Sequence, residues 1–338
     1  MNERLGVTLA PTKQIPLDAV VELALLAERL AYESIWVPET WGYDAVTLLS
    51  MLAVKTSRIR LASGVLNVFS RSAALVAQTA ASLQDLSESR FVLGLGTSGP
   101  IVVESWHGVP FRDPIVRTRE YVGVIRLALS GQSVDYEGET MRLRRFRLLN
   151  PPAVMPPIYV AALGTRNVRL TGEIADGWLP TFAARGQLDA LRGELRAGMT
   201  LAGRRPGAID VAAYLPAALG PSGERLLRQQ LAYYIGGMGT FYHGFISRLG
   251  LGGDADEVRA HWTAGRHREA AAAVSQEILD LCTLGSSADQ ARRRLTEYRE
   301  DGIGLPIVGI PHGASVQEVA DTIEALAFQR SMSGIPDR

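Results

Sequence analysis

The sequence of 338 residues lacks several features that would assign it to a class at once. A single cysteine, Cys282, excludes an internal disulfide and a cysteine-based metal site, and it suits a reducing cytoplasm. The 35 basic and 35 acidic side chains give a formal net charge of zero, so no general attraction to nucleic acid or anionic lipid is expected. No apolar run approaches the roughly 20 residues that a membrane span requires. We therefore expect a cytoplasmic protein without a signal peptide and without nucleic-acid or membrane partners.

Catalytic motifs with a recognisable spacing are also missing. Neither G-x-S-x-G, nor a P-loop, nor H-E-x-x-H occurs in the chain. The five histidines are scattered, and the pair His261 and His267 is six residues apart, so we expect no metal site. The functional residues must therefore be sought where the fold brings side chains together.

The sequence does contain a regular alternation of short apolar runs and longer helical runs. The expected strands are residues 5–10, 34–38, 58–65, 90–95, 157–162, 177–181, 209–214 and 305–310. Helical runs follow these strands, beginning near residues 17, 45, 73, 114, 167, 187, 288 and 316. Strands that alternate with helices require a parallel sheet, and eight right-handed crossovers close into a (β/α)8 TIM barrel, an α/β fold.

Two stretches are too long to be simple connections of such a barrel. The first, about 131–156, follows the fourth strand, and its central Glu137-Gly138 is typical of a hairpin turn. The second, about 217–286, follows the seventh strand and is largely helical. Insertions of this length are usually functional lids or interfaces. Because no linker or repeat divides the chain, we expect one domain over residues 1–338 with these two insertions.

Active sites of TIM barrels lie at the carboxyl ends of the strands, so the loops after the strands carry the candidates. The third expected strand leads into Ser63-Gly64-Val65-Leu66-Asn67, where glycine permits unusual backbone conformations. This pattern fits an ordinary bulge at the barrel rim and a ligand site equally well. The fourth strand runs into Gly94-Leu-Gly96-Thr97-Ser98-Gly99, which matches G-x-G-x-x-G. Since Pro100 follows and we expect no helix to start at once, we interpret it as a barrel loop that lets a flat ring or a phosphate approach the backbone.

The fifth strand ends in Ala162-Leu163-Gly164-Thr165-Arg166, directly before a helical run. Free N–H groups, a hydroxyl and the helix dipole suit a phosphate there, whereas a plain threonine N-cap is the simpler alternative.

The second strand is followed by Glu39-Thr40-Trp41-Gly42-Tyr43-Asp44. An acid beside two aromatic residues is typical of a pocket wall for a planar ligand, with Glu39 placed for proton transfer and Asp44 for capping the next helix. Trp106 and His107, after the fourth strand, are expected to face the same pocket.

Several segments together resemble the luciferase-like monooxygenase superfamily, and within it the oxidoreductases that depend on coenzyme F420, a deazaflavin. The most specific matches are residues 34–44, 81–96, 110–121, 173–178 and 234–239. Residues 82–96, S-L-Q-D-L-S-E-S-R-F-V-L-G-L-G, are similar to a family signature that has glycine where this chain has Ser89. The resemblance extends over nearly the whole chain.

The resemblance implies a ring held at the carboxyl ends of the strands, against a non-prolyl cis peptide at Gly64–Val65. It also implies a cofactor phosphate on the loop 163–166, with help from the strand that ends at Trp178, and a homodimer. We expect these cofactor-binding residues: Ser63, Gly64, Val65, Asn67, Gly96, Thr97, Ser98, Ala162, Leu163, Gly164, Thr165, Arg166 and Trp178. The expected catalytic residues are Glu39 and Trp41, and the expected substrate-binding residues are Tyr43, Trp106 and His107.

The chain departs from the sugar-phosphate dehydrogenases that it resembles. They carry an Asp-His pair after the second strand, where this chain has Glu39-Thr40, and their acid after the fourth strand aligns with Gly99. A sugar phosphate is therefore not the expected substrate. The first hypothesis is hydride transfer between the deazaflavin and a small organic substrate bound over its ring. Two others remain: a monooxygenase that uses reduced FMN, and a non-catalytic barrel.

Overall fold

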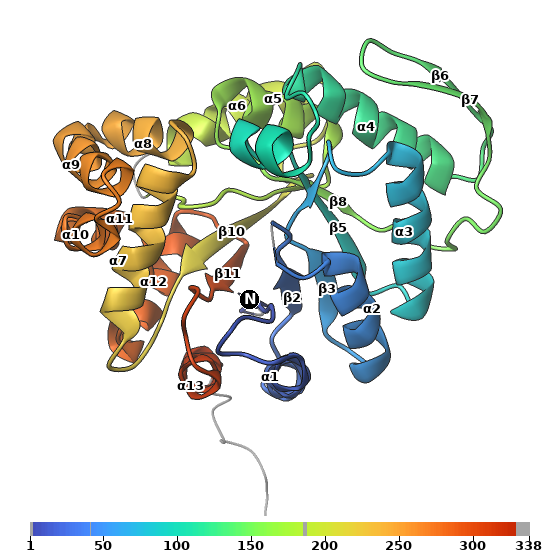
Figure 1. The fold of residues 1–338 in the computed structure, drawn as a ribbon. Coiled ribbons are helices and arrows are strands. Elements are labelled where there is room, and N and C mark those ends of the chain that lie inside the picture. The colour runs from blue at the N-terminus through green and yellow to red at the C-terminus, as the bar shows by residue number, and fades with distance from the viewer. Residues whose placement is uncertain (1–2, 41, 185–187, 329–338) are drawn as a thin grey trace, which may run out of the picture.

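The computed structural model describes residues 3–40, 42–184 and 188–328. Eight parallel strands close into a barrel, with β3 paired to both β2 and β5, and helices surround it (Figure 1). Around the barrel the strands are β1 (Gly6–Thr8), β2 (Ser34–Val37), β3 (Arg60–Ser63), β5 (Phe91–Gly96), β8 (Ile158–Val160), β9 (Gly177–Trp178), β10 (Asp210–Pro216) and β11 (Leu305–Gly309). The predicted TIM barrel is confirmed, and each strand lies within one residue of an expected run or extends it by no more than two residues.

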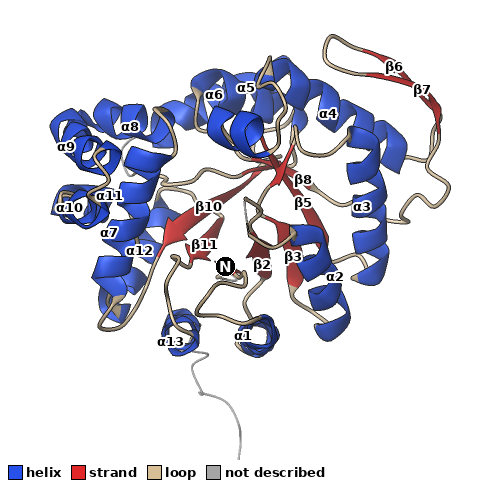
Figure 2. Ribbon diagram, viewed as in Figure 1, coloured by secondary structure: helices blue, strands red, loops and turns tan. Residues whose placement is uncertain are grey.

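A helix follows each barrel strand and packs on the outside of the sheet (Figure 2). These helices are α1 (Leu17–Arg29), α2 (Ala45–Lys55), α3 (Ala73–Leu86), α4 (Pro114–Leu129), α5 (Thr165–Ile174), α6 (Leu188–Leu201), α12 (Ala288–Glu300) and α13 (Val316–Leu326). Capping side chains fix several starts: Asp44, Ser72, Ser287 and Ser315 each accept a backbone N–H of the first turn. Among the described residues, no helix is long and apolar enough to cross a membrane.

The barrel interior is a small apolar core of its own, separate from the larger core between sheet and helices. Its buried members are Trp36, Ala62, Val92, Tyr159, Leu179, Ala212, Leu305 and Ile307. Three partly buried side chains, Val65, Ala161 and Tyr214, pack against this core. Val65 and Ala161 follow the ends of β3 and β8 and Tyr214 lies two residues before the end of β10, so we call these three residues, near the carboxyl ends of their strands, the barrel floor.

The third strand is not continuous over 58–65 as predicted. It ends at Ser63, and a separate short strand, β4 (Leu66–Asn67), resumes the pairing with β5. Ala62 pairs with Val92 and Leu66 pairs with Leu95. Between these two pairs the segment from β3 to β4 advances by four residues, whereas β5 advances by three. This one-residue excess is a β-bulge, which displaces the backbone at the barrel rim. The Gly64–Val65 peptide within it is cis, which confirms that expectation.

The segment after α4 contains a two-stranded antiparallel hairpin, β6 (Val134–Glu137) and β7 (Arg142–Phe146), which extends away from the barrel (Figure 1). Its turn follows Glu137, where a hairpin turn was expected. The carboxylate of Glu120, on α4, accepts hydrogen bonds from the backbone N–H of Glu139 (2.6 Å) and of Thr140 (2.9 Å) and from the Thr140 hydroxyl (2.6 Å). One buried carboxylate therefore fixes the hairpin to the barrel.

Replacing Glu120 with glutamine is expected to destabilise the protein at pH 7 by about 1–2 kcal/mol, because hydrogen bonds to a charged acceptor are lost. Burial opposes ionisation of Glu120, but the Thr140 and Glu139 donors outweigh it and lower its pKa. A lowered folded-state pKa gives stability that is present above the unfolded pKa of about 4.3 and is lost as the pH falls through the folded value. Urea unfolding at pH 7 and pH 3 should show the difference between wild type and variant shrinking in acid. A difference independent of pH would contradict this account.

The segment after β10 is helical, as expected, and lies beside the barrel (Figure 1). It comprises α7 (Gly223–Ala232), α8 (Phe241–Ile246), α9 (Gly252–Thr263), α10 (His267–Ala272) and α11 (Gln276–Cys282), with π-helical stretches η2 (Tyr233–Gly237) and η3 (Ser247–Leu251). The thiol of Cys282 is buried in it, and burial raises the pKa of this thiol to about 12. A reactive thiol would need a lowered pKa, so Cys282 is a packing residue.

Candidate active site

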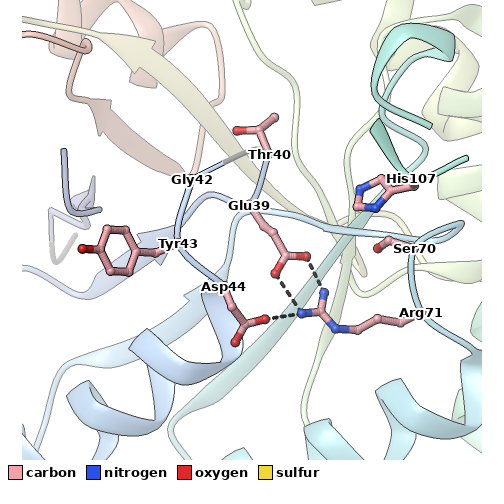
Figure 3. A pocket seen from close by; sticks show the side chains of 8 residues that line it. All are labelled: Glu39, Thr40, Gly42, Tyr43, Asp44, Ser70, Arg71 and His107. Atoms are coloured by element: carbon pink, nitrogen blue, oxygen red, sulfur yellow. Dashed lines mark hydrogen bonds and ion pairs between the residues drawn. The ribbon is translucent and has the colours of Figure 1, made fainter. Parts of the chain in front are cut away.

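A cavity of about 290 Å³ opens at the carboxyl ends of the strands. Its lining residues come from the loop after β2, the loop after β4 and the end of η1 (Ile101–Trp106). They are Glu39, Thr40, Gly42, Tyr43, Asp44, Ser70, Arg71 and His107 (Figure 3). The structure thus brings together Glu39, Tyr43 and His107, which the sequence placed on one pocket.

The centre of this cavity wall is an ion-pair cluster of Glu39, Asp44 and Arg71. Both carboxylates point at the Arg71 guanidinium (Figure 3), which bonds Glu39 through both terminal nitrogens and Asp44 through one. The side chains of Arg71 and Glu39 are only 18% and 12% exposed, so the pair is largely shielded from water. The Tyr121 hydroxyl, on α4, donates to the Arg71 carbonyl at 2.9 Å and so holds the loop that carries Arg71. The cluster carries two negative charges against one positive.

The charged forms of Arg71 and Asp44 are stabilised by their contacts within this cluster. Hydrogen bonds to Glu39, followed by the charges of both carboxylates, raise the pKa of Arg71 despite its burial. Burial opposes ionisation of Asp44, but hydrogen bonds from Thr47 and the charge of Arg71 outweigh it and lower the pKa of Asp44. Asp44 also caps α2, as expected, by accepting the Thr47 N–H at 2.7 Å.

Glu39 is more constrained than a free acid or base. Its Oε1 accepts the Ala45 N–H (3.1 Å) and an Arg71 N–H (2.9 Å), and its Oε2 accepts the other Arg71 nitrogen. Arg71 was not among the predicted site residues, although a lone arginine just before a predicted helix, in the loop after the third strand, was a usable signal. Trp41 lies outside the described residues. Trp106 is 61% exposed and does not line the cavity.

Two glycines on the barrel floor are approached closely by neighbouring side chains. A Cβ at Gly64 would lie 2.0 Å from the Tyr214 hydroxyl, and one at Gly96 would lie 2.7 Å from a Val65 methyl group. The Ser63 hydroxyl is already used, since it donates to the Gly94 carbonyl and accepts the Gly94 N–H, both at 2.9 Å. These contacts explain why small residues stand at this end of the third and fourth strands.

The loops after β5 and β4 contribute further polar groups. Thr97 donates to the adjacent Ser98 carbonyl at 3.2 Å, and Ser98 is exposed with a positive φ of 56°. The expectation that no helix follows this loop at once is wrong, because η1 begins at Ile101. The side-chain amide nitrogen of Asn67 is buried and has no hydrogen-bond partner among the described residues.

The amino terminus of α5 is open. The N-cap is Gly164 and not Thr165, so the threonine-cap alternative is wrong, and no side chain caps the helix. Thr165 and Arg166 are exposed and Leu163 is partly exposed, and no atom in the described ranges lies within 4 Å of a Cβ placed on Gly164. Uncapped N–H groups at a helix amino terminus attract anions. The buried Trp178 indole N–H donates to the Ala162 carbonyl at 2.8 Å, so Trp178 supports this loop from behind.

Comparison with known families decides the relationship, because the chain matches the luciferase-like monooxygenase model over residues 4–304. The chain belongs to this family. It is therefore an oxidoreductase of the luciferase-like type.

Relatives cover almost the entire chain. A protein of Mycobacterium tuberculosis named "Putative coenzyme F420-dependent oxidoreductase Rv3520c" is 29% identical, over 94% of this chain and 98% of its own length. The 5,10-methylenetetrahydromethanopterin reductase of Archaeoglobus fulgidus is 27% identical, over 85% and 88%. The structure of the coenzyme F420 dependent tetrahydromethanopterin reductase from Methanopyrus kandleri superposes with a TM-score of 0.84 at 21% identity, covering 97% of this chain and 98% of that one.

Proposed function

We propose that this protein is a coenzyme F420-dependent oxidoreductase that transfers a hydride to or from a small organic substrate. The observation that carries the choice of coenzyme is the near-full-length likeness to the mycobacterial oxidoreductase of that name. When bound, the deazaflavin would supply the ring carbon that donates or accepts the hydride. The protein would supply orientation, exclusion of water and an electrostatic environment.

The residues at the barrel mouth fit such a group. The floor of Val65, Ala161 and Tyr214 is largely apolar, which suits the face of a flat ring. The uncapped start of α5 at Gly164, with Arg166 beside it, suits the phosphate of the coenzyme arm. Two buried polar atoms, Asn67 Nδ2 and Asn167 Oδ1, have no hydrogen-bond partner in the described part of the chain; Asn67 follows the bulge, and Asn167 lies in the first turn of α5.

The cavity at Glu39 would hold the substrate. Its volume of about 290 Å³ is at the small end of ligand pockets. The cluster of Glu39, Asp44 and Arg71 has an excess of one negative charge, so a neutral substrate is favoured over a phosphorylated one. Glu39 would act as the group that orients the substrate, together with His107 and Tyr43.

Titration of the purified protein with oxidised coenzyme F420 and, separately, with FMN tests this proposal. We expect fluorescence quenching by the deazaflavin with a Kd in the micromolar range or below, and weaker binding of FMN. The Arg166→Glu variant, which changes an exposed side chain, should bind the deazaflavin about tenfold more weakly at low salt, with an unchanged thermal midpoint.

Two outcomes would reject the proposal. Micromolar binding of FMN with no deazaflavin binding would support the flavin monooxygenase instead. Failure of both cofactors to bind would support a non-catalytic barrel.

A further inference from the structure

Tyr214 differs from the other side chains of the barrel floor because it carries a hydroxyl group. Tyr214 lies near the carboxyl end of β10, a strand that contributes none of the predicted site residues. Its hydroxyl is buried and has no hydrogen-bond partner among the described residues. It points at the bulge between β3 and β4, where a Cβ on Gly64 would lie 2.0 Å away.

We infer that the Tyr214 hydroxyl is a built-in hydrogen-bond donor for the polar edge of the ring that binds on the barrel floor. The inference rests on the proposed function, and it adds a cofactor-binding residue to it. The pyrimidine part of a deazaflavin or flavin carries carbonyl oxygens and ring nitrogens, and these are the acceptors that a phenol can serve.

A structural role does not explain this hydroxyl. The ring of Tyr214 packs edge-on against Trp36, with centroids 6.0 Å apart, and phenylalanine would keep that contact. A buried hydroxyl without a partner costs stability relative to a methylene or aromatic C–H. Retaining the hydroxyl here is therefore explained by a partner that arrives with a ligand.

Tyr159 provides the contrast within the same core. It packs on Trp36, with centroids 5.7 Å apart, but its hydroxyl donates to the Asp210 carboxylate at 2.6 Å. Asp210 in turn binds Arg4, whose guanidinium also pairs with Glu33. The Tyr159 hydroxyl thus belongs to an internal network, whereas the Tyr214 hydroxyl faces the bulge between β3 and β4.

The protonation state suits a donor. Burial raises the pKa of Tyr214 well above its usual range, and the neighbouring Tyr234 raises it further. The hydroxyl therefore keeps its proton throughout the neutral range and can donate a hydrogen bond, but it does not act as a base.

Tyr214→Phe and Tyr159→Phe form a matched pair for the test. Two quantities are measured for each protein: the thermal midpoint without cofactor, and the Kd for oxidised coenzyme F420. For Tyr214→Phe we expect an unchanged or raised midpoint and a Kd about three- to tenfold weaker, the range of one lost neutral hydrogen bond. For Tyr159→Phe we expect a midpoint lower by roughly 2–5 °C and an unchanged Kd.

If wild type and Tyr214→Phe bind the deazaflavin equally, the inference fails while the proposed function stands. If the midpoint of Tyr214→Phe falls as far as that of Tyr159→Phe, the hydroxyl has an internal partner and the inference fails. If wild type binds FMN and no deazaflavin, the choice of coenzyme fails, and a weaker Kd of Tyr214→Phe for FMN still supports the donor. If neither binds, both proposals are overturned.

Discussion

Gly94→Ala is expected to lower the free energy of unfolding by at least about 3 kcal/mol and to reduce the yield of folded protein. Gly94 is in the middle of β5, and a Cβ there would lie 2.0 Å from the Ser63 carbonyl oxygen on the neighbouring strand. Because that oxygen belongs to the backbone of the barrel, it cannot move aside without disturbing the pairing of β3. The Ser63 hydroxyl would also lose its paired hydrogen bonds with Gly94.

Gly99→Ala is the matched control, since it changes the last glycine of the same G-x-G-x-x-G pattern. No atom of the described residues lies within 4 Å of a Cβ placed at Gly99, so the effect of this substitution should stay within about 0.5 kcal/mol. Denaturant unfolding followed by circular dichroism measures both. Equal effects of the two substitutions would show that the clash with Ser63 does not control the stability of the strand.

Arg71→Met is expected to destabilise the fold by about 2–4 kcal/mol, because it leaves the largely shielded Glu39 carboxylate without its cation. In a Glu39→Gln background the same substitution should cost clearly less, since only Asp44 then loses its cation, and that carboxylate is 45% exposed and keeps its hydrogen bonds from Thr47. Urea unfolding of the two single variants and the double variant at pH 7 gives the coupling energy between the two residues.

Arg119→Met is the control for charge removal in general. Arg119 pairs with Glu173 on the surface, with half of its side chain exposed, and such pairs contribute less than about 1 kcal/mol. If Arg71→Met lowered the free energy of unfolding no more than Arg119→Met, the Glu39–Arg71 pair would behave as a surface contact. The view that this pair forms a fixed wall of the cavity would then be wrong.

The sequence predicted the barrel well because its signals are local. Apolar runs of strand length alternate with helical runs, and the capping residues Asp44, Ser72, Ser287 and Ser315 stand directly before the helices they start. The sequence did not decide whether the third strand is interrupted, since Gly64 fits a bulge and a ligand site equally. The bulge itself depends on the register between β3, β4 and β5, which no short stretch of sequence specifies.

The candidate site was only partly predictable. Glu39, Tyr43 and His107 were expected on one pocket and do line one cavity. The pairing of Glu39 with Arg71 was missed, because the two residues are 32 positions apart and belong to the loops after β2 and β4. Thr165 was a candidate N-cap, but it is the first residue of α5, and Gly164 is in the capping position.

The sequence by itself determined the alternation of strands and helices, and with it a barrel whose functional loops lie at one end. Side-chain periodicity and capping act over a few residues, so they can be read from a single chain. Only the tertiary structure decided which buried polar groups have a hydrogen-bond partner. Closing the sheet places Tyr214 of β10 against Gly64, 150 positions earlier in the chain. Within the described ranges the Tyr214 hydroxyl has no partner, whereas that of Tyr159 donates to the carboxylate of Asp210. Contacts across a barrel depend on which strands become neighbours and in what register, and that is a property of the packed whole.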